Sequence, residues 1–238
     1  LNLQDALARV GQSTCIPTLE DDAGFQCSNL YDAALALIGG THVVGNDIEA
    51  SACPVVVVTG ANRGGKSTFL RSLGQAQLLT QCGLFAPADQ FTTGVRAGIF
   101  THFKRGEDAS MRSGKLDEEL RRMSAIVDQV APGSLILLNE SFASTNEREG
   151  SEILRQVVDA FATAGVRVVL VTHLYDFAHR LYGVARTDAL FLRANRDESG
   201  DRDFRLVVGE PLPTSFGEDV FHRIFDTEST QPATQPAI

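Results

Sequence analysis

A run of four valines that leads into a glycine-rich loop is the strongest constraint this chain places on its own fold. Residues 55–58 are β-branched throughout and are bounded by Pro54 and Gly60. The run is too short for a helix and predicts a strand that is buried on both faces. Residues 66–82 then carry apolar side chains at helical spacing, and Gly83 follows where a helix would end. The sequence therefore predicts a strand, a glycine loop and a helix in direct succession.

The alternation of strand and helix patterns continues along the chain. Residues 135–138 and 166–171 are two further apolar runs that predict buried strands. Residues 113–130 show an amphipathic helix pattern, and a second one follows Asn146, with Glu149 placed for a capping box. This alternation is typical of an α/β fold, in which a mostly parallel sheet is flanked by helices.

The sequence pattern divides the chain into three regions. Residues 51–226 carry the alternating strands and helices and are predicted to form the main domain. A hairpin over 190–194 and 204–208 is expected to add a small antiparallel element to it. Residues 1–50 form a lead-in with turn signals and little periodicity, and the polar, proline-containing tail at 227–238 is expected to be disordered. Because the chain does not begin with methionine, we expect it to be a piece of a longer protein.

The loop between the first predicted strand and helix matches the pattern G-x-x-x-x-G-K-[ST]. Glycines allow backbone N–H groups to turn inward around phosphate oxygens, and a helix N-terminus adds positive potential. Lys66 is expected to reach the β- and γ-phosphates of a nucleotide, and the hydroxyl of Ser67 is expected to bind Mg²⁺. The predicted phosphate-binding residues are Gly60, Ala61, Asn62, Arg63, Gly64, Gly65, Lys66, Ser67 and Thr68.

Polar side chains that follow the two later strands are candidates for the chemistry of phosphate transfer. We expect Glu140 to polarise an attacking water and Asn139 to hold the metal beside Ser67, although an amide lacks the charge of the aspartate usual there. His173 follows the third apolar run, where it would face a ligand crevice and contact the γ-phosphate. The catalytic prediction is therefore Glu140, His173 and Lys66. The structural alternative is that Asn139 and Glu140 only cap or turn the chain, and that His173 is a structural residue with its hydrogen bonds satisfied within the protein.

Charge and composition disfavour several other functions. The chain has 21 lysines and arginines against 30 aspartates and glutamates, a net charge of −9 that repels nucleic-acid backbones and anionic lipids. Its longest apolar runs are far below the ~18 residues needed to cross a bilayer, so we expect no membrane association. The four cysteines show no metal-ligand spacing and are interpreted as reduced packing residues of a cytoplasmic protein.

Together these residues resemble the ATPase domain of MutS-like DNA mismatch-repair proteins, within the wider group of ABC-type ATPases. Residues 59–68 are T-G-A-N-R-G-G-K-S-T, similar to the family's T-G-x-N-x-G-G-K-S-T. The resemblance spans residues 47–225 and implies a P-loop NTPase fold of the ABC/MutS type. Its further motifs are G-L-F-A-P-A at 83–88, I-F-T-H at 99–102, S-T at 144–145 and S-F-G at 215–217.

The resemblance implies an ATPase that uses ATP and Mg²⁺ and forms a homodimer with composite sites. Ser113 is similar to the serine that completes the site of the opposite subunit in this family. ATP binding would then control dimer closure, and thereby the grip on DNA of domains outside this chain. Asn139 in place of aspartate, and S-F-A at 141–143 in place of a glycine-rich turn, make the chain similar to a divergent branch of the family.

Two other functions stay open at this point. A nucleotide-gated dimerisation module with little turnover would account for the neutral Asn139. A transporter or chromosome-organising ABC ATPase would carry L-S-G-G-Q before the second acidic strand, whereas this chain has S-G-K-L at 113–116. The residue that stacks on the adenine is likewise open, with Phe25 and Tyr31 as candidates.

Overall fold

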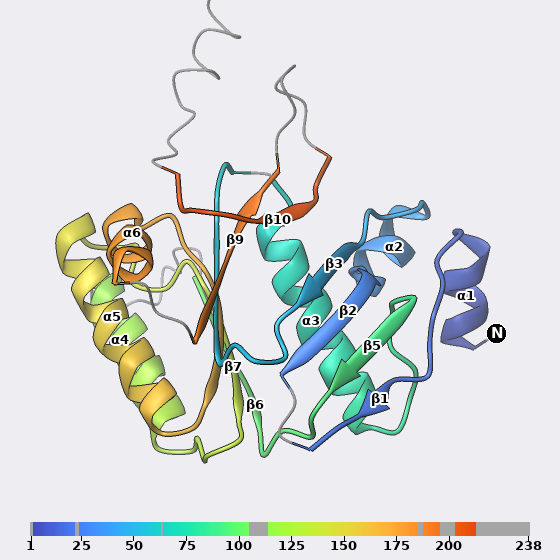
Figure 1. Cartoon of the computed structure of the whole chain (residues 1–238), viewed down its shortest axis with the longest axis horizontal. Helices are drawn as coiled ribbons and strands as arrows, with labels where there is room; N and C mark the ends of the chain where they lie inside the picture. The colour runs from blue at the N-terminus through green and yellow to red at the C-terminus, as the bar shows by residue number, and fades with distance from the viewer. Residues whose placement is uncertain are drawn as a thin grey trace, which may run out of the picture.

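The computed structural model describes residues 2–21, 24–62, 64–104, 114–184, 188–195 and 203–212, and Figure 1 labels its helices and strands. The predictions for Arg63, Ser113, the S-F-G segment at 215–217 and the tail at 227–238 concern residues outside these ranges. In chain order, the elements are α1 (Leu3–Arg9), β1 (Thr18–Leu19), β2 (Phe25–Leu30), α2 (Ala33–Gly39), β3 (Asn46–Glu49), β4 (Val55–Thr59), α3 (Lys66–Gln81), β5 (Gln90–Thr93), β6 (Ile99–Phe103), α4 (Lys115–Val127), β7 (Leu135–Asn139), α5 (Glu147–Thr163), β8 (Arg167–Val171), α6 (Tyr175–Gly183), β9 (Ala189–Ala194) and β10 (Leu206–Val208).

A six-stranded sheet in the order β10-β9-β4-β8-β7-β6 forms the centre of the molecule. The strands from β9 to β6 are parallel to their neighbours, and β10 pairs with β9 in the antiparallel direction. The valines of β4 are fully buried because this strand lies between β8 and β9 and is covered on both faces. The prediction of an α/β fold with a mostly parallel sheet and a small antiparallel hairpin is confirmed.

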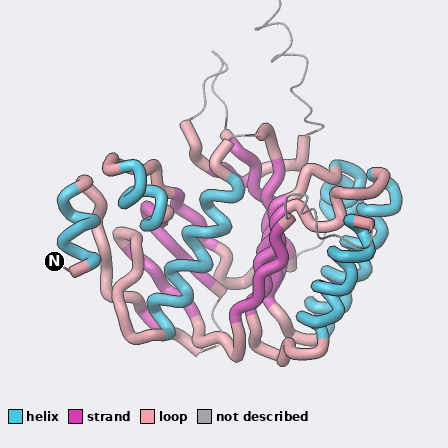
Figure 2. The backbone as a smooth tube through the Cα atoms, turned by 180° about the vertical axis from the view of Figure 1, so that it is seen from behind, coloured by secondary structure: helices cyan, strands magenta, loops and turns pink. Residues whose placement is uncertain are grey.

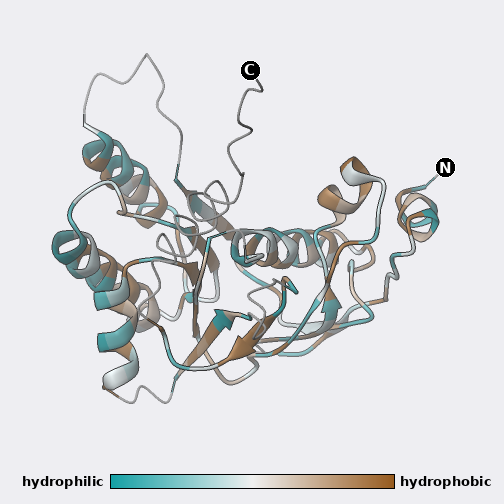
Figure 3. Ribbon diagram, turned by 90° about the horizontal axis from the view of Figure 1, so that it is seen from above, coloured by the Kyte–Doolittle hydropathy of each residue, from teal (hydrophilic) through white to brown (hydrophobic). Residues whose placement is uncertain are grey.

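Helices cover both faces of this sheet (Figures 1 and 2). Successive side chains of a strand point to opposite faces, so Val56 and Val58 pack in the core cluster with α3. Val55 and Val57 pack in a second cluster with side chains of α4, α5 and α6. Figure 3 shows the hydrophobic residues gathered on the strands and the hydrophilic ones on the outward sides of these helices.

A second sheet, in the order β1-β5-β2-β3, packs on the other side of α3. Strands from both sides of residue 50 share this sheet, because β5 pairs with β1 and β2. At the far end of α3, the side-chain oxygen of Gln81 accepts a hydrogen bond of 2.9 Å from the backbone N–H of Arg96. The oxygen of Gln77 accepts another, of 2.8 Å, from the hydroxyl of Thr93. Helix α3 is therefore enclosed between two sheets and anchored where the chain passes from one sheet to the other.

The helices predicted from the sequence are present, with close bounds for α3 and a shorter extent for α4. Residues 66–82 correspond to α3, and 113–130 contain α4. Asn146 caps α5, since its side-chain oxygen accepts a hydrogen bond of 3.0 Å from the N–H of Glu149. The cysteines are free, but only Cys27 is buried and Cys82 is exposed, so the packing role does not extend to Cys82. None of the helices that the structure describes between residues 2 and 212 combines the length and hydrophobicity that crossing a bilayer demands.

Candidate functional site

The glycine loop lies at the carboxyl end of β4 and is shaped by two glycines with positive φ. Gly60 has φ 110° and Gly65 has φ 87°, a region that disfavours residues with a Cβ atom. A Cβ at Gly60 would lie 2.9 Å from the backbone nitrogen of Ala194, and one at Gly65 would lie 2.9 Å from the carbonyl oxygen of Phe204. The loop therefore needs glycine at both positions for conformation and for close packing.

Lys66 places its ammonium group inside this loop. The side chain is only 4% exposed, and Nζ donates hydrogen bonds of 2.7 and 2.8 Å to the carbonyl oxygens of Gly60 and Ala61. Gly65 is the N-cap of α3 and supplies no side-chain hydrogen bond to the first turn of the helix. A cation and a positive helix end therefore face the same small space, where an anion would compete with the two carbonyls for the ammonium.

A side-chain hydrogen bond connects Ser67, just after the loop, to Asn139. The hydroxyl of Ser67, in the first turn of α3, donates a hydrogen bond of 2.9 Å to the Oδ1 atom of Asn139, the last residue of β7. Hydroxyl and amide oxygens are ligands that Mg²⁺ accepts. The described ranges contain no group of three or more histidines, cysteines, aspartates and glutamates that could hold a metal. The protein oxygens that Ser67 and Asn139 offer to a cation are neutral.

Glu140 lies on the wall of the same space. It lines a cavity of about 130 Å³ together with Asn62, Gly64, Gly65, Lys66, Ser67 and Thr68. Its φ of 53° is in the left-handed region, and its backbone N–H donates a hydrogen bond of 2.9 Å to the carbonyl of Val171 at the end of β8. The position of Glu140 therefore depends on a backbone hydrogen bond to β8 as well as on the direction of β7.

His173 lies beside Glu140, outside the group of residues that line the cavity. Its Nδ1 atom is 4.0 Å from Oε1 of Glu140, and its side chain is 45% exposed, against 27% for Glu140. The structure thus brings Lys66, Ser67 and Glu140 to one cavity, with Asn139 bonded to Ser67 and His173 at the outer edge.

A buried histidine that had no predicted role holds the loop after Glu140. His102 of β6 is 0% exposed; its Nδ1 is 2.7 Å from the Oγ of Ser141 and its Nε2 is 3.1 Å from the carbonyl oxygen of Glu119. Because a carbonyl only accepts, Nε2 carries the hydrogen and Nδ1 accepts from the Ser141 hydroxyl. Burial, with a smaller contribution from the charge of Arg122, lowers the pKa of His102 and keeps the ring neutral.

A second contact ties α4 to the same loop. Glu119 of α4 is 3% exposed and accepts a hydrogen bond of 3.0 Å from the hydroxyl of Ser144. The ring of His102 also stacks on Phe142, with 5.6 Å between ring centroids. The orientation of Glu140 therefore depends on how α4 sits against β6. The resemblance gave His102, Ser141 and Ser144 only as positions in motifs, and no role was predicted for any of the three.

The aromatic residues proposed for the adenine are buried elsewhere, so that prediction is wrong. Tyr31 is 0% exposed and donates a hydrogen bond of 2.7 Å to the carbonyl of Ser13, and Phe25 is 2% exposed against Phe69 in the core. The space beside the loop is instead a largely apolar cavity of about 380 Å³. It is lined by Leu35, Gly39, Thr41, His42, Val43, Val44, Asn46, Gly65, Thr68, Phe69, Ser72 and Phe204.

The geometry defines an α/β protein with a lysine-containing glycine loop between a central strand and a helix. A family model, MutS domain V, matches residues 56–223, which is more than half of the chain. The chain belongs to the MutS family.

Curated relatives agree with this assignment. The chain is 29% identical over 213 residues to the DNA mismatch repair protein MutS of Chloroflexus aurantiacus, a match that covers 82% of this chain and 22% of that protein. It is 31% identical over 186 residues to the endonuclease MutS2 of Latilactobacillus sakei (77% and 23%), and 30% identical over 197 residues to the putative endonuclease MutS2 of Bacillus subtilis (80% and 24%). The chain therefore spans between a fifth and a quarter of the length of these relatives.

Proposed function

We propose that this chain is an ATPase domain with a P-loop NTPase fold, and that it binds and hydrolyses Mg·ATP in the glycine loop. The observation that carries the proposal is convergence: the ammonium of Lys66, the hydroxyl of Ser67 and the carboxylate of Glu140 line one cavity, although they come from two elements far apart in sequence. We assign this function to residues 51–226, with residues 1–50 as its lead-in.

Each polar side chain of the site has a role that follows from its chemistry. Lys66 would leave the carbonyls of Gly60 and Ala61 for phosphate oxygens, because a charged acceptor forms the stronger hydrogen bond. Ser67 and Asn139 would hold Mg²⁺, which neutralises charge on the phosphates when it is bound. Glu140 would orient a water and accept its proton, and His173 would contact the γ-phosphate from the edge of the site.

The nucleoside part of ATP would occupy the 380 Å³ cavity. This cavity adjoins the loop because the two share Gly65 and Thr68. Val43 and Phe204 give it apolar walls suited to the faces of a base, and the side chain of His42 adds a ring that can stack. These residues take the place of Phe25 and Tyr31, the two candidates that the sequence left open.

Assembly and DNA binding extend the proposal beyond this chain. We infer a homodimer in the cytoplasm, with each ATP site completed by Ser113 of the opposite subunit, and DNA contacts made by parts of the protein outside these residues. The support is the family membership and the names of the relatives, which are mismatch-repair and MutS2 endonuclease proteins. A mixed dimer with Lys66→Ala on one chain and Ser113→Ala on the other should retain one active site of two. Retention of none or of both would contradict composite sites.

A nucleotide-gated dimerisation module with little turnover is the second candidate, and the neutral Asn139 beside Ser67 favours it. Single-turnover phosphate release separates the two functions. Glu140→Gln should keep ATP affinity and slow release by about 10²–10⁴-fold if Glu140 acts as a general base. Glu20→Gln, at an exposed position in the first fifty residues, is the matched control. Release that is equal in the wild type and Glu140→Gln would leave only the binding module, and full ATP affinity in Lys66→Ala would refute the loop assignment itself.

A further inference from the structure

The loop between β7 and α5, residues 140–146, has an unusual backbone conformation beside the candidate catalytic carboxylate. Glu140 has φ 53° and Phe142 has φ 62°, so residues with a Cβ atom occupy the left-handed region on both sides of Ser141. Steric contacts of the Cβ atom disfavour this region, and such residues persist where the surrounding structure holds them. The contacts of the 140–146 loop therefore decide where the side chain of Glu140 lies.

Backbone contacts with β8 and α5 hold part of this loop. The N–H of Glu140 donates a hydrogen bond of 2.9 Å to the carbonyl oxygen of Val171, the last residue of β8. The carbonyl oxygen of Phe142 lies so close to Gly150 of α5 that a Cβ atom at Gly150 would collide with it. Both contacts are made by backbone atoms of the loop, and its serine side chains bond to other elements.

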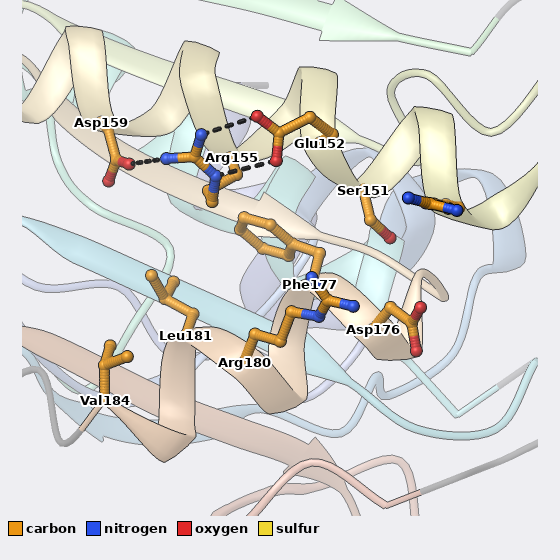
Figure 4. A pocket seen from close by; sticks show the side chains of 10 residues that line it. Ser151, Glu152, Arg155, Asp159, Asp176, Phe177, Arg180, Leu181 and Val184 are labelled. Carbon is orange, nitrogen blue, oxygen red and sulfur yellow. Dashed lines mark hydrogen bonds and ion pairs between the residues drawn. The ribbon is translucent and has the colours of Figure 1, made fainter.

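Helix α5, into which the loop leads, is itself fixed to α6 (Figure 4). Oε1 of Glu147, in the first turn of α5, accepts hydrogen bonds from the backbone N–H groups of Tyr175 and Asp176, at 2.9 and 3.3 Å. Phe177 and Leu181 of α6, which Figure 4 labels, pack in the same core cluster as apolar side chains of α5. The end of the loop therefore starts from a firmly placed helix.

Helix α4 reaches the same loop through a buried carboxylate. The buried residues of α4 are Glu119 and Met123, and Glu119 is 3% exposed. Its Oε2 atom accepts a hydrogen bond of 3.0 Å from the hydroxyl of Ser144. A carboxylate is rarely buried, because its transfer out of water costs free energy, and an apolar residue in such a place is often at least as stabilising. Packing of α4 alone therefore does not account for Glu119.

The same residue of α4 also holds the start of the loop, through His102. The backbone carbonyl of Glu119 accepts a hydrogen bond of 3.1 Å from Nε2 of His102, and Nδ1 of this ring accepts one of 2.7 Å from the hydroxyl of Ser141. Ser141 is the residue that follows Glu140. The main chain and the side chain of Glu119 thus reach the 140–146 loop at two points, one next to Glu140 and one near the start of α5.

We propose that Glu119 and His102 are positioning residues for Glu140, so that the position of α4 sets the rate of ATP hydrolysis without changing the affinity for ATP. The inference rests on the proposed function, in which Glu140 acts on the attacking water. The cavity of the glycine loop is lined by residues between 62 and 68 and by Glu140. Of these lining residues, Glu140 alone belongs to the loop that α4 holds, so a change in α4 reaches the catalytic carboxylate and leaves the phosphate-binding residues in place.

The first test measures single-turnover phosphate release and ATP affinity in the 238-residue protein. Ser144→Ala and Glu119→Leu each remove the hydrogen bond between the two side chains and should slow release about tenfold at unchanged ATP affinity, because a displacement of about 1 Å costs up to about 10²-fold. Glu119→Gln keeps an oxygen that can accept from Ser144 and should restore release to within about threefold of the wild type. Ser124→Ala, at an exposed position on the same helix, is the matched control and should change neither quantity.

A double variant shows whether the effect passes through Glu140. Ser144→Ala added to Glu140→Gln should slow release no further, since the carboxylate that it positions is already gone. The same slowing in both backgrounds would overturn the proposal. So would a Ser144→Ala protein that binds ATP more weakly but releases phosphate at the wild-type rate.

Amide hydrogen exchange tests the coupling without ATP. In Ser144→Ala, the amide of Glu140 should exchange about tenfold faster relative to that of Val57, an amide of the central strand that reports on unfolding of the whole domain. An unchanged ratio would overturn the proposal whether or not the protein hydrolyses ATP. Faster exchange of Glu140, combined with phosphate release that is equal in the wild type and Glu140→Gln, would support the coupling of α4 to Glu140 and refute the proposed ATPase function alone.

Discussion

Replacing His102 with leucine removes both ring hydrogen bonds of a buried side chain while roughly conserving its volume. The bonds lost are those to the hydroxyl of Ser141 at 2.7 Å and to the carbonyl of Glu119 at 3.1 Å. At about 1 kcal/mol for each neutral hydrogen bond, we expect His102→Leu to lower the free energy of unfolding by about 2 kcal/mol. The Ser141 hydroxyl keeps an acceptor in this variant, the backbone carbonyl of residue 102 at 3.1 Å.

Ser141→Ala should cost a similar amount, about 2 kcal/mol, because it leaves the buried Nδ1 of His102 without a donor. The double variant removes the same bond only once, so the two losses should fall short of additivity by about 1 kcal/mol. Urea unfolding measures all four proteins, and an unchanged m value confirms that the same surface is exposed. Additive losses, within about 0.3 kcal/mol, would refute the assignment of the pair as one hydrogen-bonded unit.

The same histidine predicts how stability depends on pH. Burial lowers the pKa of His102 below the ordinary 6.5. Below pH 6.5 the histidine therefore binds a proton in the unfolded chain more readily than in the folded chain. The contribution of His102 is therefore complete above pH 6.5 and is lost as the pH falls toward the lowered pKa, by at most about 1.4 kcal/mol per pH unit. His102→Leu should lack this part of the slope. Identical pH slopes in the wild type and the variant, between pH 7 and 5, would contradict a buried neutral ring.

Further predictions concern the loop and the buried charges. Asn139→Asp should lower the Mg²⁺ concentration needed for nucleotide binding, measured by titration, because it adds a charge next to the Ser67 hydroxyl. Gly65→Ala should destabilise the fold by more than the ~1 kcal/mol expected for positive φ alone. Gly11→Ala, at φ 75° with open space around it, should show only that conformational cost in the same thermal unfolding assay. Asp32→Ala should lower the free energy of unfolding by about 2–3 kcal/mol, because the buried carboxylate of Asp32 accepts a hydrogen bond of 2.8 Å from Nε of Arg71. The loss stays below that of a fully buried ion pair because the Arg71 side chain is 45% exposed.

The parts of the fold that sequence predicted well are those whose burial is set by neighbours on both sides. The valines of β4 are apolar at every position because β8 and β9 flank the strand and helices cover both its faces. Helix α3 was predicted to within a residue, since the glycine loop defines its start and Gly83 follows its end. The edge strand β6 was missed, because Thr101 is exposed and His102 is a polar residue at a buried position.

The parts of the site that sequence could not predict depend on contacts between distant segments. His102 meets Glu119 and Ser141, which lie 17 and 39 positions along the chain, so no local spacing marks it. The burial of Phe25 and Tyr31, two open candidates for the adenine contact, could not be predicted because residues 1–50 show little periodicity. Their burial follows from the second sheet, which covers α3 with residues from both sides of residue 50.

Because α3 is enclosed between two sheets, it forms a rigid link between the glycine loop and the opposite end of the helix. At 1.5 Å per residue its 16 residues reach about 24 Å, from the loop at Gly65 to the anchors of Gln77 and Gln81. Packing against a sheet on two opposite sides opposes rotation of the helix. We expect a displacement of its first turn to be transmitted along the helix axis to Thr93 and Arg96, which bond to its other end.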